Sequence, residues 1–175
     1  MTVRKLTETD AERLAALLTD LSERDLTLIR EDLSDPGLAR RILGAPGYRW
    51  AAEGPDGALL GYATISRLPG WSNHVGELRL VVAEAARGQG LGAELAKEAM
   101  RSAFGDGVTK IVIELPTDAE GAVALFSRLG FTGEALLRDH LETDDGQKHD
   151  LLVLAHHAQD VMNTLTYTGI ADELA

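Results

Sequence analysis

The sequence has no cysteine among its 175 residues, which excludes disulfide bonds, thiolate metal sites and a cysteine nucleophile. This absence is compatible with a cytoplasmic location, which we expect, although it cannot by itself fix a compartment. Long apolar runs are missing as well. None follows residues 1–5 and none elsewhere approaches the length of a membrane-spanning helix, so we expect no signal peptide and no membrane partner.

Basic residues are few relative to acidic ones. The chain has 17 lysines and arginines against 28 aspartates and glutamates, which gives a formal net charge of −11. A negative field disfavours nucleic acid, whose phosphates need cationic partners. The same field would favour a cationic substrate such as an amine, but solubility alone also accounts for it and is the simpler explanation. The charge therefore excludes one class of partner and selects no substrate.

The composition is otherwise that of a globular protein, with 45% hydrophobic and 26% charged residues. The length fits one domain, which we place at residues 1–155, with a tail or short helix at residues 156–175. Apolar periodicity predicts helices or helical turns at 14–21, 26–33, 38–43, 91–104 and 119–129. Strands are expected at 3–6, 48–53, 58–67, 74–82, 108–115, 132–141 and 149–155. This order predicts an α/β (α+β) domain with a mixed sheet and helices on its faces.

A glycine-rich turn joins the predicted strand at 74–82 to the predicted helix at 91–104. It reads Arg87-Gly88-Gln89-Gly90-Leu91-Gly92, so three glycines remove side chains where a bound anion needs close approach to the backbone. Free N–H groups and the dipole at a helix start attract phosphate or pyrophosphate, and Arg87 adds a cation at the rim. The alternative is a flexible turn before a surface helix, in which three glycines would cost entropy without a benefit. The turn therefore predicts an anion site.

The spacing of this turn excludes two common phosphate motifs. A Walker loop ends in Gly-Lys-Ser/Thr, whereas residues 92–94 read Gly-Ala-Glu. A dinucleotide fingerprint is Gly-x-Gly-x-x-Gly after the first strand of a βαβ unit, whereas residues 88–92 read Gly-Gln-Gly-Leu-Gly and follow a meander. The sequence also has no Gly-x-Ser-x-Gly elbow, so a serine hydrolase is not supported.

Two segments resemble, in order, the signatures of the GNAT acyltransferase superfamily. That superfamily uses Arg-x-x-Gly-x-Gly after a Val-rich strand to bind CoA, and residues 87–92 match this pattern. Residues 122–131, AVALFSRLGF, resemble its second signature, Ala-x-x-Leu-Tyr-x-Lys/Arg-x-Gly-Phe. The resemblance covers about residues 3–155, and the segments that match the family's motifs lie within residues 77–131. It implies a mixed, mostly antiparallel sheet of six to seven strands with helices on both faces.

The resemblance implies direct transfer of an acyl group, usually acetyl, from acetyl-CoA to a primary amine of a small molecule, a peptide or a protein. In this family the strand before the turn splays from its parallel neighbour, and the pantetheine arm of CoA lies in the gap. Carried over to this sequence, the implied cofactor contacts are Leu80, Val81, Val82, Arg87, Gly88, Gln89, Gly90, Leu91, Gly92, Ala93, Phe126 and Arg128. A backbone donor near Val81 or Val82 would stabilise the oxyanion. Dimers are common in the family, so a homodimer is a possible assembly.

The implied chemistry needs a base, because an ammonium group cannot attack a thioester before it loses a proton. Glu77, on the strand that leads into the turn, is the candidate, acting directly or through water. The alternative is a solvated or salt-bridged strand carboxylate. His74 is a weaker candidate near the start of the same strand. His156 and His157 are adjacent and would point to opposite faces of a strand, so we expect no metal.

Two departures from the family concern the leaving group. Phe126 stands where the family commonly has a tyrosine that can protonate the departing thiolate, and Ala119 replaces a frequent asparagine. Either the thiolate leaves without an acid, which its low basicity permits, or another group such as Ser127 or Tyr167 substitutes. The departures also motivate an alternative function, an acyl-CoA-binding regulatory module with little or no catalysis. The acceptor amine cannot be read from the sequence, because no motif marks the segments expected to contact it.

Overall fold

A computed structural model describes residues 1–22, 25, 35–143 and 146–159 of the chain. Its seven strands form one sheet in the order β1-β2-β3-β4-β5-β7-β6. The strands are β1 (Thr2–Lys5), β2 (Tyr48–Glu53), β3 (Leu59–Arg67), β4 (Val75–Val82), β5 (Lys110–Pro116), β6 (Thr132–Glu142) and β7 (Lys148–His157). Every neighbouring pair is antiparallel except β4 and β5, which run parallel. The predicted mixed, mostly antiparallel sheet is confirmed.

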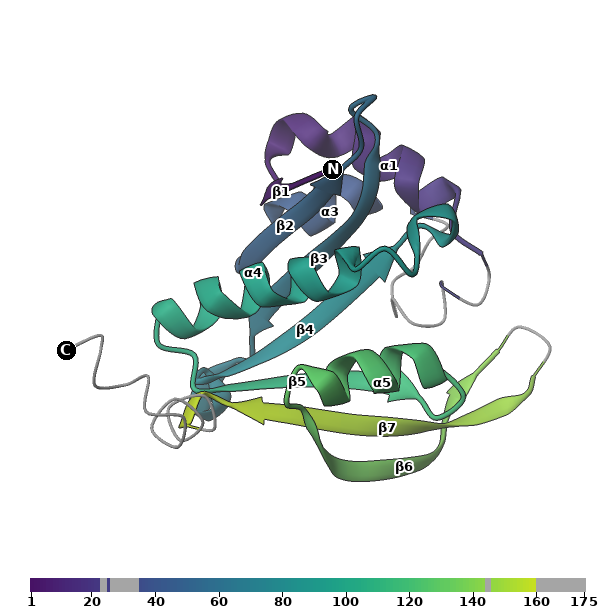
Figure 1. The fold of residues 1–175 in the computed structure, drawn as a ribbon. Coiled ribbons are helices and arrows are strands. Elements are labelled where there is room, and N and C mark those ends of the chain that lie inside the picture. The colour runs from purple at the N-terminus through teal and green to yellow at the C-terminus, as the bar shows by residue number, and fades with distance from the viewer. Residues whose placement is uncertain (23–24, 26–34, 144–145, 160–175) are drawn as a thin grey trace.

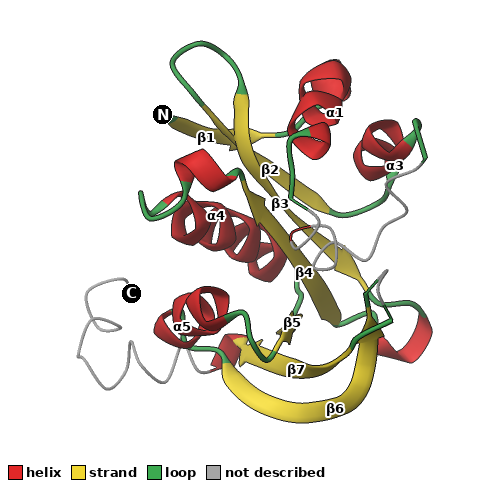
Figure 2. Cartoon of the chain, turned by 90° about the vertical axis from the view of Figure 1, so that its right-hand side faces the viewer, coloured by secondary structure: helices red, strands yellow, loops and turns green. Residues whose placement is uncertain are grey.

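Helices cover both faces of this sheet, as predicted (Figure 2). They are α1 (Ala11–Thr19), α3 (Leu38–Gly44), α4 (Leu91–Gly105) and α5 (Glu120–Arg128), with short 3-10 turns at Glu8–Asp10, Gly70–Ser72 and Glu84–Ala86. Helices α1 and α3 lie on one face, and α4 and α5 on the other (Figure 2). The predicted helix at 26–33 lies outside the described residues.

The sheet has a hydrophobic core on each face, because side chains alternate between the two faces along each strand. Along β3, Tyr62 packs with the leucines of α1 and α3, whereas Ala63 and Ile65 pack with α4. Successive side chains of a strand point to opposite faces, so one strand serves both helical layers. Helix α4 is anchored by four residues that are wholly buried, namely Leu95, Ala96, Ala99 and Ala103. The glycine-rich turn at its start is therefore built on a fixed support.

A buried ionic cluster joins β1 to α1. The Asp10 carboxylate is fully buried, accepts hydrogen bonds from Arg4 at 2.8 and 2.9 Å, and also pairs with Arg13. The Thr7 amide donates to the same carboxylate at 2.9 Å. The hydrogen bonds from Arg4 dominate over the opposing effect of burial and hold the pKa of Asp10 well below its usual range. The start of the domain is thus fixed by charge as well as by apolar packing.

The end of the sheet differs from its predicted boundary. Strand β7 continues to His157, so the first two residues of the predicted tail belong to the sheet, and residues 160–175 lie outside the described part. His156 is buried between the rings of Phe104 and Phe131, and its Nδ1 lies 3.0 Å from the carbonyl oxygen of Gly130. His157 is half-exposed on the opposite face. The periodicity of the apolar residues alone did not reveal this extension, because histidine is not an apolar residue.

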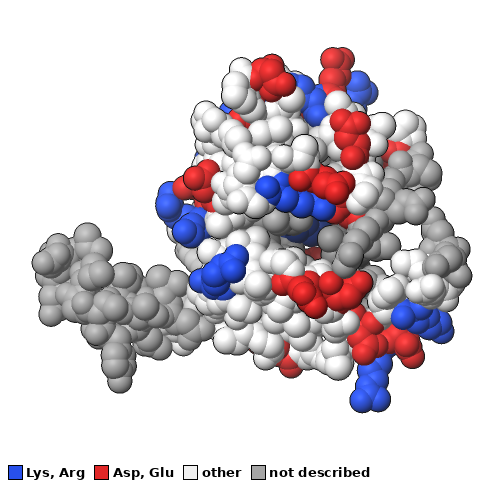
Figure 3. All heavy atoms as spheres, turned by 45° about the vertical axis from the view of Figure 1, so that its right-hand side comes forward, with Lys and Arg blue, Asp and Glu red and all other residues white. Residues whose placement is uncertain are grey.

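The surface mixes charges of both signs. On the face seen in Figure 3, acidic and basic side chains of the described residues are interspersed, and lysines and arginines form no continuous patch. No helix within the described ranges is both long enough and apolar enough to cross a membrane.

The sheet opens into a fork between its two parallel strands. Strands β4 and β5 are paired only at Val75–Lys110, Gly76–Ile111 and Glu77–Val112. Beyond Glu77 and Val112 both strands continue without pairing to each other, and they diverge (Figure 1). Strand β4 remains with β3, while β5 remains with β7. The fork separates β1–β4 from β5–β7 and positions the candidate site.

Candidate functional site

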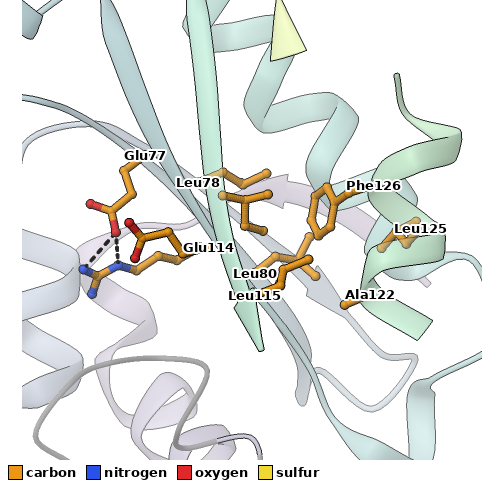
Figure 4. Close-up of a pocket in the computed structure, with 10 residues that line it drawn as sticks. Glu77, Leu78, Leu80, Glu114, Leu115, Ala122, Leu125 and Phe126 are labelled. Atoms are coloured by element: carbon orange, nitrogen blue, oxygen red, sulfur yellow. Dashed lines mark hydrogen bonds and ion pairs between the residues drawn. The ribbon is translucent and has the colours of Figure 1, made fainter. Parts of the chain in front are cut away.

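A cleft lies in the fork between β4 and β5. Helix α5 closes one side, and the lining consists of Glu77, Leu78, Arg79, Leu80, Ile113, Glu114, Leu115, Ala122, Leu125 and Phe126. Charged side chains gather on one side of this cleft and apolar ones on the other (Figure 4). The cleft can therefore hold an extended, largely apolar group whose reactive end meets charged residues.

The β4 strand also presents backbone groups to the cleft. At the two ends of β4, hydrogen bonds to β3 show which residues face that strand: the Val75 carbonyl accepts from the Leu68 amide at 2.9 Å, and the Ala83 amide donates to the Leu60 carbonyl at 2.8 Å. Backbone groups alternate sides along a strand, so Leu78, Leu80 and Val82 direct their N–H and C=O groups toward the fork. Beyond the Glu77–Val112 pair β5 has diverged, so strand pairing satisfies neither the backbone groups of Leu80 nor the amide of Val82. The Val82 carbonyl accepts a hydrogen bond from Arg87. The groups of Leu80 and the Val82 amide are free to bind an amide-containing chain.

Of the three predicted contact residues on β4, Leu80 and Val82 direct their backbone groups toward the fork, whereas Val81 does not. The backbone of Val81 points to β3, where Val81 pairs with Tyr62, and its side chain is buried under α1 and α3. Of the two predicted oxyanion donors, the amide of Val82 faces the fork and that of Val81 does not. The register of β4 against β3 gives this distinction, and the sequence alone could not.

The glycine-rich turn begins just beyond the end of β4. Within the described part of the chain, the amides of residues 88–92 donate to no backbone carbonyl. The amide of Ala93, in contrast, donates to the Gly90 carbonyl at 3.0 Å. Five successive amides at the start of the 15-residue helix α4 are thus available to an anion, in the field of the helix dipole. This arrangement fits the pyrophosphate of CoA.

The three glycines of the turn have two different roles. Gly88 and Gly90 have positive φ angles of 74° and 84°, and a Cβ at either would have no neighbour within 4 Å, so the space above them is open to a ligand. A Cβ at Gly92 would lie 3.2 Å from the Leu125 side chain. Gly92 therefore lets α4 approach α5 closely, and Gly88 and Gly90 shape the anion cradle.

Arg87 is tied to the protein on both sides. Its Nε donates to the Val82 carbonyl at 3.0 Å, and its Nη2 pairs with the buried carboxylate of Asp25. Burial opposes ionisation of Asp25, but hydrogen bonds from Arg87 and Ser22 keep its pKa below the usual range. The Gln89 side chain donates to the Ala85 carbonyl at 3.3 Å. Both predicted rim residues thus brace the turn itself.

Glu77 lies at the apex of the fork. Its carboxylate is 27% exposed and accepts hydrogen bonds from Nε and Nη2 of Arg79, each at 3.3 Å. These contacts are long for charge-assisted bonds, so the pair is loose enough to admit a third group. The predicted alternative, a salt-bridged strand carboxylate, is therefore part of the structure, and it coexists with access from the cleft.

Glu114 is a site residue that we did not predict. It lines the cleft from β5, and its carboxylate points toward the same region as that of Glu77 (Figure 4). The signal that could have found it is a single carboxylate in the otherwise apolar segment 111–115, IVIEL. Charged residues are rarely placed in such strands without a reason.

A second pocket lies on the α3 face of the sheet, with a volume of about 150 Å³. Its lining consists of Ile42, Ala45, Arg49, Thr64, Ser66, Glu77 and Arg79. Glu77 and Arg79 thus line both hollows. A molecule in this pocket and a thioester in the fork would meet at Glu77.

The other predicted site residues lie in different surroundings. Phe126 is 1% exposed, lines the cleft and packs edge-to-face on Phe131 with ring centroids 5.2 Å apart. Arg128 and Ser127 are exposed on α5, and neither is among the lining residues of the cleft. His74 is exposed at the start of β4 and lines neither hollow. Tyr167 lies outside the described residues.

Neither tyrosine of the described region can replace the missing acid from its present position. The Tyr62 side chain is buried under α1 and α3, and the Tyr48 hydroxyl donates to Asp106. The described residues also bring together no group of three or more histidine, aspartate or glutamate side chains that could hold a metal ion. The chemistry available at the fork is that of carboxylates, an arginine and backbone amides.

Comparison with known proteins gives the same assignment over most of the chain. Residues 14–131 match the family described as the acetyltransferase (GNAT) family. The N-alpha-acetyltransferase RimI of Mycobacterium tuberculosis is 32% identical over 139 residues, which is 79% of this chain and 82% of that protein.

Solved structures share the fold. A ribosomal-protein-alanine N-acetyltransferase from Brucella melitensis superposes with a TM-score of 0.77 at 26% identity, over 90% of this chain and 99% of that one. A putative acetyltransferase from Salmonella typhimurium, solved with its cofactor acetyl-CoA, gives a TM-score of 0.72 at 22% identity, over 89% and 92% of the two chains.

Proposed function

The chain belongs to the GNAT acetyltransferase family and is an acetyltransferase, and we propose that it transfers the acetyl group of acetyl-CoA directly to a primary amine. The observation that supports this proposal most strongly is the fork, in which free β4 backbone groups lead to a row of free amides at the start of α4. A chain with amides along its length and a pyrophosphate at one end matches this layout. Acetyl-CoA has both features.

Different residues of this chain bind different parts of acetyl-CoA. The amides of residues 88–92 hold the pyrophosphate, and Leu80 hydrogen-bonds the pantetheine arm through its backbone groups. Leu125 and Phe126 cover its apolar parts from α5. The Val82 amide then faces the position where the thioester oxygen gains negative charge, and a fixed donor at that position lowers the barrier.

Glu77 accepts the proton of the acceptor ammonium. It lies where the α3-side pocket meets the fork, so an amine can approach the thioester from one hollow while the thioester lies in the other. The free amine attacks the carbonyl carbon, a C–N bond forms, and the C–S bond breaks with its electron pair on sulfur. Before the attack, the Glu77 carboxylate removes one proton from the ammonium group, directly or through a water molecule. After the attack the nitrogen releases its second proton to solvent, so that the product is a neutral amide.

The thiolate leaves without a protein acid in this proposal. Phe126 has no proton to donate, and a thiol of ordinary pKa, near 8.5, forms a stable thiolate more easily than an alkoxide or amide leaving group would form. Solvent then protonates the thiolate outside the cleft. The acceptor in this proposal is a primary amine. The cytoplasmic location, the homodimer and the absence of a metal cofactor stay predictions of the sequence.

The proposal is tested by steady-state turnover of acetyl-CoA with a panel of small amines and short peptides. Because the chain has no cysteine, a thiol reagent detects released CoA without a background from the protein. We expect amine-dependent CoA release and an acetylated product of matching mass. Binding of acetyl-CoA without turnover on any amine would instead support the alternative, an acyl-CoA-binding regulatory module.

A further inference from the structure

The α3-side pocket contains an arginine that no carboxylate of the described residues neutralises. Arg49 is half-buried, and its Nη1 donates a hydrogen bond to the Ala45 carbonyl at the end of α3. Of the eleven arginines in the described residues, seven form ion pairs. Arg40, Arg128 and Arg138 form none within the described part of the chain and are exposed, whereas Arg49 forms none there and is half-buried. In a chain of net charge −11, a half-buried guanidinium without a carboxylate partner is unexpected unless its partner is a ligand.

Strand register places hydroxyl groups beside this arginine. Arg49 of β2 pairs with Thr64 of β3, and Thr64 pairs in turn with Arg79 of β4, so the three side chains form a row on one face of the sheet. Ser66 lies two residues further along β3 and pairs with Glu77. The pocket thus has an anion-binding end at Arg49 and Thr64 and a proton-accepting end at Glu77.

We propose that Arg49 and Thr64 bind a carboxylate of the acceptor, and that the acceptor is a small amino acid whose amine lies at Glu77. This inference rests on the proposed function. Two strand spacings and a two-residue offset separate the Cα atoms of Arg49 and Glu77 by about 12 Å, most of which the two side chains span. The remaining gap suits a compact zwitterion, and a cavity near 150 Å³ admits a group of about the size of a benzene ring.

The electrostatics of the whole chain support a local site of this kind. A net charge of −11 repels a carboxylate at long range, so an anionic acceptor group needs a fixed cation at its binding position. The planar guanidinium can donate two parallel hydrogen bonds to a carboxylate, which a lysine cannot do. The Thr64 hydroxyl, for which the structure shows no other hydrogen bond within the described residues, can supply a third.

The test compares small amines that differ only in the carboxylate: L-alanine with ethylamine, and L-serine with ethanolamine. For each pair we define the carboxylate preference as the ratio of the two kcat/KM values. Wild type should prefer the amino acids, and Arg49→Gln should reduce that preference by about 10- to 100-fold while the KM for acetyl-CoA stays within twofold. Arg49→Lys should restore part of it, because it keeps the charge and loses the paired geometry.

Arg101→Gln is the matched control, since it removes one positive charge from an exposed side chain of α4. It should leave the carboxylate preference within twofold. If Arg49→Gln lowers kcat/KM equally for both members of each pair, Arg49 only supports the end of α3 and the inference is wrong, although the acetyltransferase activity stands. Turnover of neither amine nor amino acid would contradict the proposed function instead.

If no compound is turned over, calorimetric titration of L-alanine and L-serine into the CoA-loaded protein decides the subsite by itself. Binding that Arg49→Gln abolishes and Arg101→Gln preserves supports it. Absence of binding to wild type, or equal binding to all three proteins, overturns it.

Discussion

Glu77 of β4 and Val112 of β5 form the last residue pair between the two parallel strands, and the fork opens directly beyond them. This relationship places the Glu77 carboxylate at the apex of the fork, where it lines both the cleft and the α3-side pocket. A strand residue in the middle of a fully paired sheet could not reach both faces. The early end of the β4–β5 ladder is therefore what makes one carboxylate available to two ligands.

Replacing Glu77 by glutamine should lower kcat by about 100-fold, because the amide keeps the shape of the side chain but cannot accept the ammonium proton. The measurement is kcat at saturating acetyl-CoA with the best amine of the panel.

Glu114→Gln is the control for Glu77, since it removes the same charge from the other side of the fork. We expect it to lower kcat by less than about tenfold. A loss of only a few-fold in Glu77→Gln would remove the general base from Glu77. A larger loss in Glu114→Gln would assign that role to Glu114.

The sequence predicted the elements of the fold better than the shape of the site. Periodicity located all seven strands, and the glycine turn together with residues 122–131 identified the family, because these signals are local. The partner of Arg87 could not be predicted, since Asp25 lies 62 residues earlier in the chain. The row of Arg49, Thr64 and Arg79 was equally hidden, because it exists only in the register of three strands.

Gly90→Glu should abolish acetyl-CoA binding, because it places a carboxylate in the open space above the free amides and against the pyrophosphate. Gly107→Glu is a closely matched control. Gly107 also has a φ of 84° and open space around its Cβ position, but it follows the C-terminal end of α4. Both variants introduce the same backbone strain and the same charge, so only Gly90→Glu should lose acetyl-CoA binding in a calorimetric titration. Equal affinities would show that the cradle is assigned to the wrong turn.

Phe126→Tyr tests whether the missing acid limits the reaction. If the thiolate leaves unassisted, restoring the tyrosine of the family should change kcat by less than about threefold and add no falling limb to the pH profile. The added hydroxyl enters a side chain that is 1% exposed, so the melting temperature should be measured alongside. A tenfold gain in kcat would show that wild type lacks an acid that its chemistry needs.

The ionic cluster at the start of the domain gives a prediction about stability. Asp10→Asn removes a fully buried negative charge and leaves Arg4 and Arg13 to share one carboxylate, that of Glu53, which should lower the free energy of unfolding by about 3 kcal/mol. Asp20→Asn, at an exposed position after α1, is the control and should stay within about 0.5 kcal/mol of wild type. Urea unfolding at neutral pH measures both differences.

The difference between wild type and Asp10→Asn should itself depend on pH. The Asp10 pKa is lowered in the folded protein, so the charge contributes its full stabilisation above the unfolded-state pKa, about 3.9, and loses it progressively as the pH falls below that value. The two proteins should therefore differ by a constant amount from pH 5 to 8, within about 0.5 kcal/mol. Their unfolding free energies should converge below about pH 4. A difference that persists unchanged at pH 3 would mean that the shape of the carboxyl group, and not its charge, holds β1 to α1.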